Sequence, residues 1–402
     1  MKKVLKRVAI GLAIVLFVLL SAISVALWFV FTPERITPVV RKQASQYLTC
    51  KSEIGSVELT FFRTFPRFGL KINNFALVNP IVSAQSDTLV RFEEFIGIVD
   101  VGAYWRNNDI VLNELIVQNG IVNAFVDSLG IANFDVTLPD TAAVDTVASQ
   151  QAFKLKIENV ELNNVNISYI DQQSKMQAEI HDLVCQFSGA MDSVNFSSKV
   201  NVENSLVSFI LEGEPYLNNA KIGMEVVSNL DLSKSLIDFD DSKFLINGID
   251  ISFKGSVEDD TLNKRINTNI TYSTNKFSVP SLIGLIPPSF QSYTEGMTLD
   301  GFATSDGKIS GFYSASGMPL MDIHIVLSEG NISYTALPWP LNNAKGDFVF
   351  YSDLTNDDIT YFRINKFSAN TPKSSFSTSC LINHLFLDIY MDLTSETTVF
   401  NL

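Results

Sequence analysis

The chain has 402 residues and a formal net charge of −14, with 46% hydrophobic but only 18% charged residues. Soluble globular domains usually carry about 25% charged residues, so this chain must either bury much apolar surface or offer it to an apolar ligand. The acidity excludes nucleic acid as a partner, because an acidic surface repels a phosphate backbone.

The first feature along the chain is an apolar segment behind a basic tail. Residues 1–7 carry four cations, and residues 8–31 carry no charge. A helix needs about 20 apolar residues to cross a bilayer core, so the sequence predicts a transmembrane helix over residues 8–31. Cations favour the cytoplasmic side, which predicts a single-pass protein with a cytoplasmic N-terminus and its body across the membrane. The residues that mark this anchor are Val8, Leu16, Trp28 and Phe31.

A cleaved signal peptide is the competing interpretation of this segment. Residues 24–26 (Ser-Val-Ala) are a small-x-small sequence of the kind that signal peptidase cuts. The apolar part of a signal peptide is about 7–15 residues long, whereas this run continues through residues 27–31. The length therefore favours an uncleaved anchor.

A short helix is predicted directly after the anchor, over residues 33–48. Thr32 can act as its N-cap, and Pro33 suits the first helical position. Apolar residues follow at helical spacing until residue 48, where a different period begins.

Beyond residue 50 the apolar residues alternate with polar ones, as in half-buried strands. The clearest predicted strands span residues 249–254, 266–272, 321–327 and 385–393. Turn signals separate such stretches at residues 73–74, 119–120, 163–164, 247–248, 306–307 and 329–331. The predicted fold is mainly β, an elongated antiparallel meander curled into an apolar groove, with short helical insertions near residues 229–239 and 275–286.

The alternation also predicts which side chains line the interior of this meander. We expect these residues to share an apolar face that takes lipid: Ile249, Ile251, Phe253, Leu385, Leu387, Ile389 and Met391.

One polar segment, residues 138–151, lacks apolar periodicity and is predicted to be a flexible acidic linker. It separates an N-terminal β region at residues 32–137 from a repetitive β-groove region at residues 152–402.

No arrangement of residues typical of an enzyme is present in the sequence, so we expect neither catalysis nor a metal or cofactor. The three histidines are isolated, and the phosphate-loop, H-E-x-x-H and G-x-S-x-G motifs are missing. Cys50, Cys185 and Cys380 are odd in number and far apart, which excludes a disulfide framework but leaves one bridge open.

Residues 50–80 carry motifs of a known family. An I-G-x-V-x-L segment lies at residues 54–59, an aromatic-Pro turn at residues 65–66 and an L-x-[IL]-x-[ND] strand at residues 70–74. With the charged start and single apolar span, this region resembles the N-terminus of AsmA-like proteins of Gram-negative bacteria. Residues 330–346 are similar to the mid-chain region of that family.

The resemblance implies an inner-membrane anchor, a periplasmic β-rich body and a part in outer-membrane biogenesis. Members resemble bridge-like lipid-transfer proteins, whose curled sheet forms a long apolar groove. The implied ligand is therefore the acyl chains of phospholipids, and no catalytic or cofactor-binding residues carry over.

A non-enzymatic assembly factor is the alternative function, in which free strand edges pair with outer-membrane assembly proteins or their substrates. The chain end bears on it, because residues 392–402 resemble residues 231–239, after which further strands follow. This pattern predicts that the region at residues 152–402 is incomplete at its C-terminus.

Overall fold

The computed structural model describes residues 32–60, 68–99, 110–136, 153–189, 194–286, 295–314, 317–353, 356–385 and 388–399. The predicted tail, transmembrane helix and linker at residues 1–7, 8–31 and 138–151 lie outside these ranges. Within them, no helix has the length and apolar character needed to cross a membrane.

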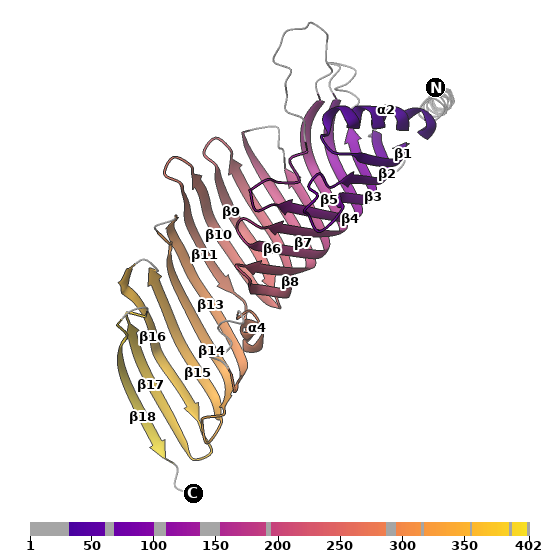
Figure 1. Cartoon of the computed structure of the whole chain (residues 1–402). Coiled ribbons are helices and arrows are strands. Elements are labelled where there is room, and N and C mark those ends of the chain that lie inside the picture. Colours follow the sequence, from indigo (N-terminus) through magenta and orange to yellow (C-terminus); the bar gives the residue numbers. More distant parts are fainter. Residues whose placement is uncertain are drawn as a thin grey trace, which may run out of the picture. The chain divides into compact units, whose positions relative to one another are not determined.

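The described residues hold two helices and eighteen strands, which confirms the mainly β class (Figure 1). The chain divides into two compact units, residues 1–156 and 157–402.

Unit 1 contains one helix and four strands. They are α2 (Pro33–Tyr47), β1 (Ser52–Thr60), β2 (Phe68–Val78), β3 (Thr88–Val99) and β4 (Ile110–Val126). Each of β1, β2 and β3 pairs antiparallel with the next strand.

The helix predicted over residues 33–48 is confirmed as α2. Thr32 is its N-cap through its carbonyl oxygen, which accepts the N–H groups of Arg35 and Ile36, and its hydroxyl makes no capping bond.

Helix α2 covers the edge of β1. The backbone N–H of Val57 donates to Thr37 Oγ1 at 2.9 Å, and Thr37 is buried. Arg41 reaches the same strand, where its guanidinium donates to the carbonyl oxygens of Ile54 and Gly55 at 2.9 Å each. These bonds satisfy backbone groups that an edge strand would otherwise leave open for pairing.

Unit 2 contains the remaining strands and one short helix; β5 runs across the boundary between the two units. The elements are β5 (Phe153–Asp171), β6 (Met176–Gly189), β7 (Asn195–Leu211), β8 (Glu214–Asp231), β9 (Leu236–Ile246), β10 (Ile249–Asp260), β11 (Arg265–Thr274), β12 (Phe277–Ser278), α4 (Val279–Ile283), β13 (Met297–Tyr313), β14 (Leu320–Tyr334), β15 (Leu341–Asp353), β16 (Asn356–Asn370), β17 (Ser374–Asn383) and β18 (Tyr390–Val399). Strands β5 to β11 pair antiparallel in chain order, β11 and β12 both pair with β13, and the order then continues to β18. The predicted antiparallel meander is thus present in unit 2.

Several predicted turns lie inside long strands, and two of them, at Asn164 and Glu329, are β-bulges that shift the strand register. Asn74, Asn119, Asn164 and Glu329 have φ between 51° and 56°, yet they lie within β2, β4, β5 and β14. Residues 306–307 likewise lie within β13. A bulge and a tight turn both place a residue in the left-handed region, so local sequence marks both alike. At residues 247–248 the predicted turn is confirmed, with φ of 48° and 84°.

The predicted strands in β10, β11 and β14 are confirmed, but the one at residues 385–393 is wrong in its bounds. The last described strand, β18, begins at Tyr390, so Leu385 and Ile389 lie in the loop after β17. His384, with a φ of 54°, turns the chain there. The predicted strand was too long because an apolar residue still occurs at every second position through this loop, which contains no glycine or proline to mark it.

The helical insertion predicted near residues 275–286 is confirmed as α4. The one near residues 229–239 is wrong, because a turn and the start of β9 occupy that stretch.

Candidate functional site: an apolar face of the sheet

The strand register of unit 2 brings apolar residues from β5 to β18 onto one face, because paired residues of antiparallel strands share a face. The first row of partners, from β5 to β10, is Leu162, Cys185, Val202, Met224, Phe244 and Ile251. The second row, from β10 to β18, is Phe253, Tyr272, Gly307, Ile323, Phe350, Phe362, Ile382 and Met391. We call this surface the apolar face.

The opposite surface of the same strands is polar. A row of partners on it, from β10 to β18, is Lys254, Thr271, Lys308, Asp322, Tyr351, Tyr361, Asn383 and Tyr390. We call this surface the polar face. The sheet of unit 2 is therefore amphipathic over its length, which is expected where only one face meets water.

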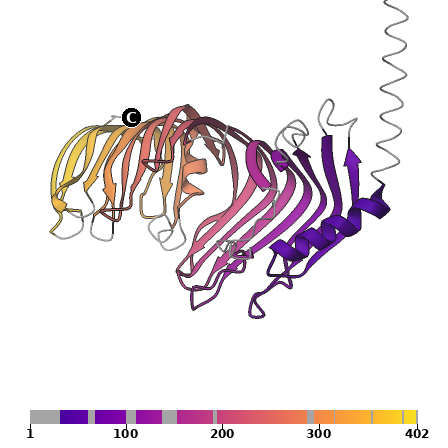
Figure 2. The ribbon, with the colours of Figure 1, turned by 90° about the horizontal axis from the view of Figure 1, so that it is seen from above.

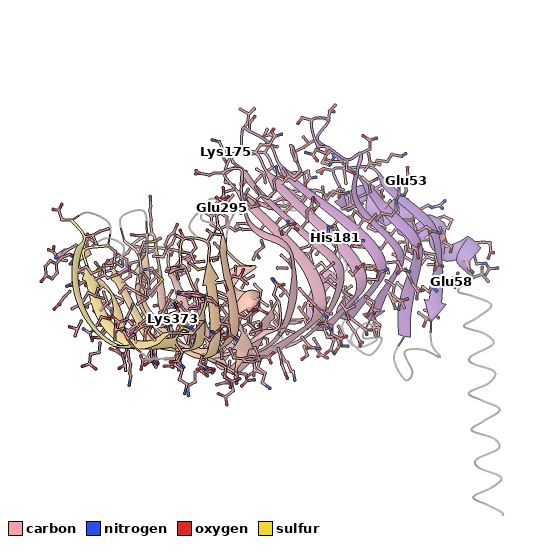
Figure 3. All side chains as sticks on the ribbon, turned by 90° about the horizontal axis from the view of Figure 1, so that it is seen from below. Glu53, Glu58, Lys175, His181, Glu295 and Lys373 are labelled. Carbon is pink, nitrogen blue, oxygen red and sulfur yellow. The ribbon has the colours of Figure 1, made fainter. Side chains whose placement is uncertain are left out.

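The apolar face is only partly covered by other elements. Every residue of its two rows is half-buried except Met391, which is exposed. Figure 3 shows the drawn side chains of unit 2 standing on both sides of a single layer of strands. A dry second layer would bury such side chains, so this face still offers contact area to a ligand.

Helix α4 packs on this face. Val279 joins Phe277, Ala303 and Leu327 in a buried cluster that also includes Ile249. Figure 2 shows α4 on the inner side of the curve that the strands of unit 2 describe. The apolar face is thus the inner, concave side of unit 2.

The electrostatics of the two rows are neutral. Neither row contains a carboxylate or a cationic side chain. Burial raises the pKa of the Cys185 thiol. Burial also raises the pKa of Tyr272, although a hydrogen bond with Ser305, 3.0 Å between the two hydroxyl oxygens, opposes it. Both groups therefore stay uncharged near neutral pH, as an apolar ligand requires.

The predicted site residues divide into three groups. Ile249, Ile251, Phe253 and Met391 lie on the apolar face. Leu385 and Ile389 lie in the loop before β18, with Ile389 exposed to solvent. The last group, Leu387 and the anchor residues Val8, Leu16, Trp28 and Phe31, lies outside the described residues.

Sequence reasoning missed the aromatic part of the apolar face in β15 to β17. Phe348 packs against Phe362 and Phe367 with ring centroids 6.1 and 6.3 Å apart, and Phe367 against Phe376 at 6.0 Å. The alternation of Phe348 and Phe350 around Val349 was the available signal. It was weak because the bulges in these strands break the period.

The sequence left open whether two of the three cysteines form a disulfide bridge. In the structure, Cys50, Cys185 and Cys380 are all free thiols. Among the residues that the structure describes, no group of three or more His, Cys, Asp or Glu side chains is placed to hold a metal ion.

Comparison with known proteins places the chain in a family. Curated proteins and solved structures gave no match. The model of the AsmA family matches residues 1–285, which include unit 1 and the strands β5 to β11. This match covers well over half of the 402 residues, and the chain therefore belongs to the AsmA family.

Proposed function

We propose that this protein binds the acyl chains of phospholipids along the apolar face and conducts them across the periplasm during outer-membrane biogenesis. Residues 8–31 anchor it in the inner membrane, and its body lies in the periplasm. The observation that carries the proposal is the pair of rows from Leu162 to Met391, which carry no charge and are half-buried at every residue except Met391.

The free energy of burial makes such transfer feasible. Burial of one CH₂ group is worth about 0.8 kcal/mol, so an acyl chain of a dozen groups would gain on the order of 10 kcal/mol on the apolar face. The same chain loses a similar amount when it leaves a bilayer. Transfer is then close to neutral in free energy, and no covalent step is needed.

Photo-crosslinking at neighbouring residues of opposite faces tests the proposal. We expect a photoreactive residue at Ile251 or Ile323 of the full chain in cells to capture phospholipid. The same residue at Ser252 or Asp322, which lie on the polar face, should capture much less. Equal lipid labelling of both faces would contradict the proposal.

The alternative function, strand-edge pairing with outer-membrane protein precursors, is favoured by β18. All ten residues of β18 are exposed, and Figure 1 shows this strand at the end of the row. This function predicts that a photoreactive residue at Leu393 captures a precursor, and that Ile251 captures no lipid.

A further inference from the structure

One edge of the sheet in unit 2 exposes an apolar side chain in five of the six hairpin loops that lie along it; the sixth, β15–β16, is described only in part. The loops concerned join β6–β7, β8–β9, β10–β11, β13–β14 and β17–β18. Their exposed residues are Val194 (54%), Leu232 (56%), Leu262 (94%), Met318 (40%) and Ile389 (66%). The strand register places all five loops at the same ends of the strands. We call this row of five side chains the apolar edge.

Neighbouring loops of the apolar edge are hydrogen-bonded to one another. The backbone N–H of Leu232 donates to the carbonyl oxygen of Val194 at 2.9 Å. The backbone N–H of Asp259 donates to the carbonyl oxygen of Ser235 at 3.0 Å. The four hairpins from β6–β7 to β13–β14 follow one another two strands apart, which gives a spacing of about 10 Å between neighbouring loops. The β17–β18 loop lies four strands beyond β13–β14. The side chains thus form an ordered line.

The geometry of the turns at Leu232 and Leu262 does not require leucine there. Three turns have the same hydrogen-bonding pattern. In each, the carboxylate of an aspartate (Asp171, Asp231 or Asp260) accepts backbone N–H groups from residues two or three positions later in the chain. Each turn ends in a residue with positive φ: Lys175, Ser235 and Lys264.

The two leucine turns lie on the apolar edge, whereas the third turn lies on the opposite edge, where Figure 3 labels Lys175. That third turn carries Gln172 and Gln173 at its tip. Turn tips favour Gly, Asn, Asp and Ser, so exposed leucine at two matched tips indicates contact with an apolar partner.

The opposite edge differs from the apolar edge. Its β5–β6, β7–β8 and β9–β10 turns expose polar residues and glycine. Leu337 and Trp339 are exposed in its β14–β15 loop, where Lys373 Nζ lies 5.3 Å from the centre of the Trp339 ring. Among the residues that the structure describes, exposed apolar side chains therefore recur in five loops of the apolar edge, whereas the β5–β6, β7–β8 and β9–β10 turns of the opposite edge expose none.

Charge identifies the kind of partner. The described loops and strand ends along the apolar edge carry seven carboxylates, Asp231, Asp259, Asp260, Asp353, Asp357, Asp358 and Asp388, and three cations, Lys234, Lys264 and Arg265. Two of these cations are already paired, Lys234 with Asp231 at 2.7 Å and Arg265 with Asp260 at 2.9 Å. An edge of this charge is repelled by an anionic membrane surface.

We propose that the apolar edge binds a long helix of a partner protein, whose apolar stripe is flanked by Lys and Arg. The stripe of such a helix repeats every seven residues, or about 10.5 Å at a rise of 1.5 Å per residue. That repeat is close to the spacing of the four hairpins from β6–β7 to β13–β14, so one heptad, or about two helical turns, meets each of these loops. This inference goes beyond lipid binding, since it uses a different surface of unit 2.

A designed peptide provides the test. The probe is a fluorescent 28-residue helix with leucine at positions a and d of each heptad and lysine at most others. We expect it to bind the full chain in detergent, with affinity that falls as salt increases. The variant L232Q/L262Q/I389Q should bind it at least tenfold more weakly. The matched control Q172N/Q173N, on the polar turn of the same design, should bind it like the wild type.

Three further measurements bear on the proposal. A peptide with glutamate in place of lysine should bind at least tenfold more weakly, which tests the charge without altering the protein. Equal peptide binding by the triple variant would overturn the proposal. So would leucine-dependent flotation of the wild type with phosphatidylethanolamine–phosphatidylglycerol vesicles, or a change of oligomeric state in the triple variant.

Discussion

At the residue scale, His324 joins three strands on the polar face. Its Nδ1 lies 3.1 Å from Asp306 Oδ1 in β13, and its Nε2 lies 3.1 Å from Asp347 Oδ1 in β15. Asn365 Nδ2 also donates to Asp347 Oδ1, at 2.9 Å. Burial lowers the pKa of His324, but the hydrogen bonds and charges of the two aspartates outweigh it and raise the pKa above its usual value.

The raised pKa of His324 predicts a pH dependence of stability. A group whose pKa is higher in the folded state stabilises fully below its unfolded pKa, about 6.5 for histidine, and loses that contribution as pH rises through the folded pKa. We expect an NMR titration to give His324 a pKa above that of a free histidine. The double variant D306N/D347N should lower it, because it removes both carboxylates.

The control for this titration is Asp322→Asn, which removes a carboxylate from the same strand without touching the imidazole. It should leave the pKa of His324 nearly unchanged. A His324 pKa that does not fall in the double variant would show that the two aspartates do not hold the proton.

At the element scale, α2 protects the first strand with polar side chains. Thr37 and Arg41 bond the backbone of β1, whereas Val39 on the same helix is exposed. The apolar pattern of the helix gave no sign of this, because the contact is a set of hydrogen bonds to a strand edge. An uncovered edge would invite pairing with another chain.

Replacement of Thr37 by valine tests this cover. The variant keeps the shape but leaves the N–H of Val57 unsatisfied, which should reduce the free energy of unfolding of unit 1 by about 1–3 kcal/mol. Hydrogen exchange of the β1 amides in the full chain should become faster. Thr37→Ser, which retains the hydroxyl, should exchange nearly like the wild type, and Val39→Ala should have little effect. Unchanged exchange in Thr37→Val would refute the role of the hydroxyl.

At the scale of the whole molecule, the proposed lipid transport requires an apolar face without interruption by charge. Phe350 lies on that face in the middle of its second row, and the adjacent Val349 lies on the polar side of β15. A charge placed on an acyl path costs several kcal/mol, because it must be dehydrated where no partner exists.

Glutamate at these two positions therefore separates the faces. We expect Phe350→Glu to reduce phospholipid transfer between vesicles by the full chain at least tenfold. Val349→Glu should transfer at nearly the wild-type rate. Circular dichroism of both variants checks that the sheet is retained, and equal transfer by two folded variants would count against the apolar face as the path.

For most of the segments with a clear local pattern, the sequence alone determined whether they form a helix or a strand. Period-two alternation revealed the strands containing Ile249, Ile266 and Met321, because in a half-buried strand the pattern of side chains records the two faces directly. Helical spacing and Pro33 revealed α2, and the motifs at residues 54–74 led to the family. The alternation also predicted that Ile249, Ile251, Phe253 and Met391 share one face of the sheet, and the strand register brings them together there.

Only the tertiary structure decided how these strands combine. The register that joins Leu162 to Met391 depends on bulges at residues such as Asn164, whose positive φ is equally typical of a turn. The phenylalanines of β15 to β17 and the hydroxyl of Thr37 gained their roles from strands that lie far away in the sequence or across an edge. Pairing and exposure are set by neighbours in space, and a local pattern carries no information about which neighbours those are.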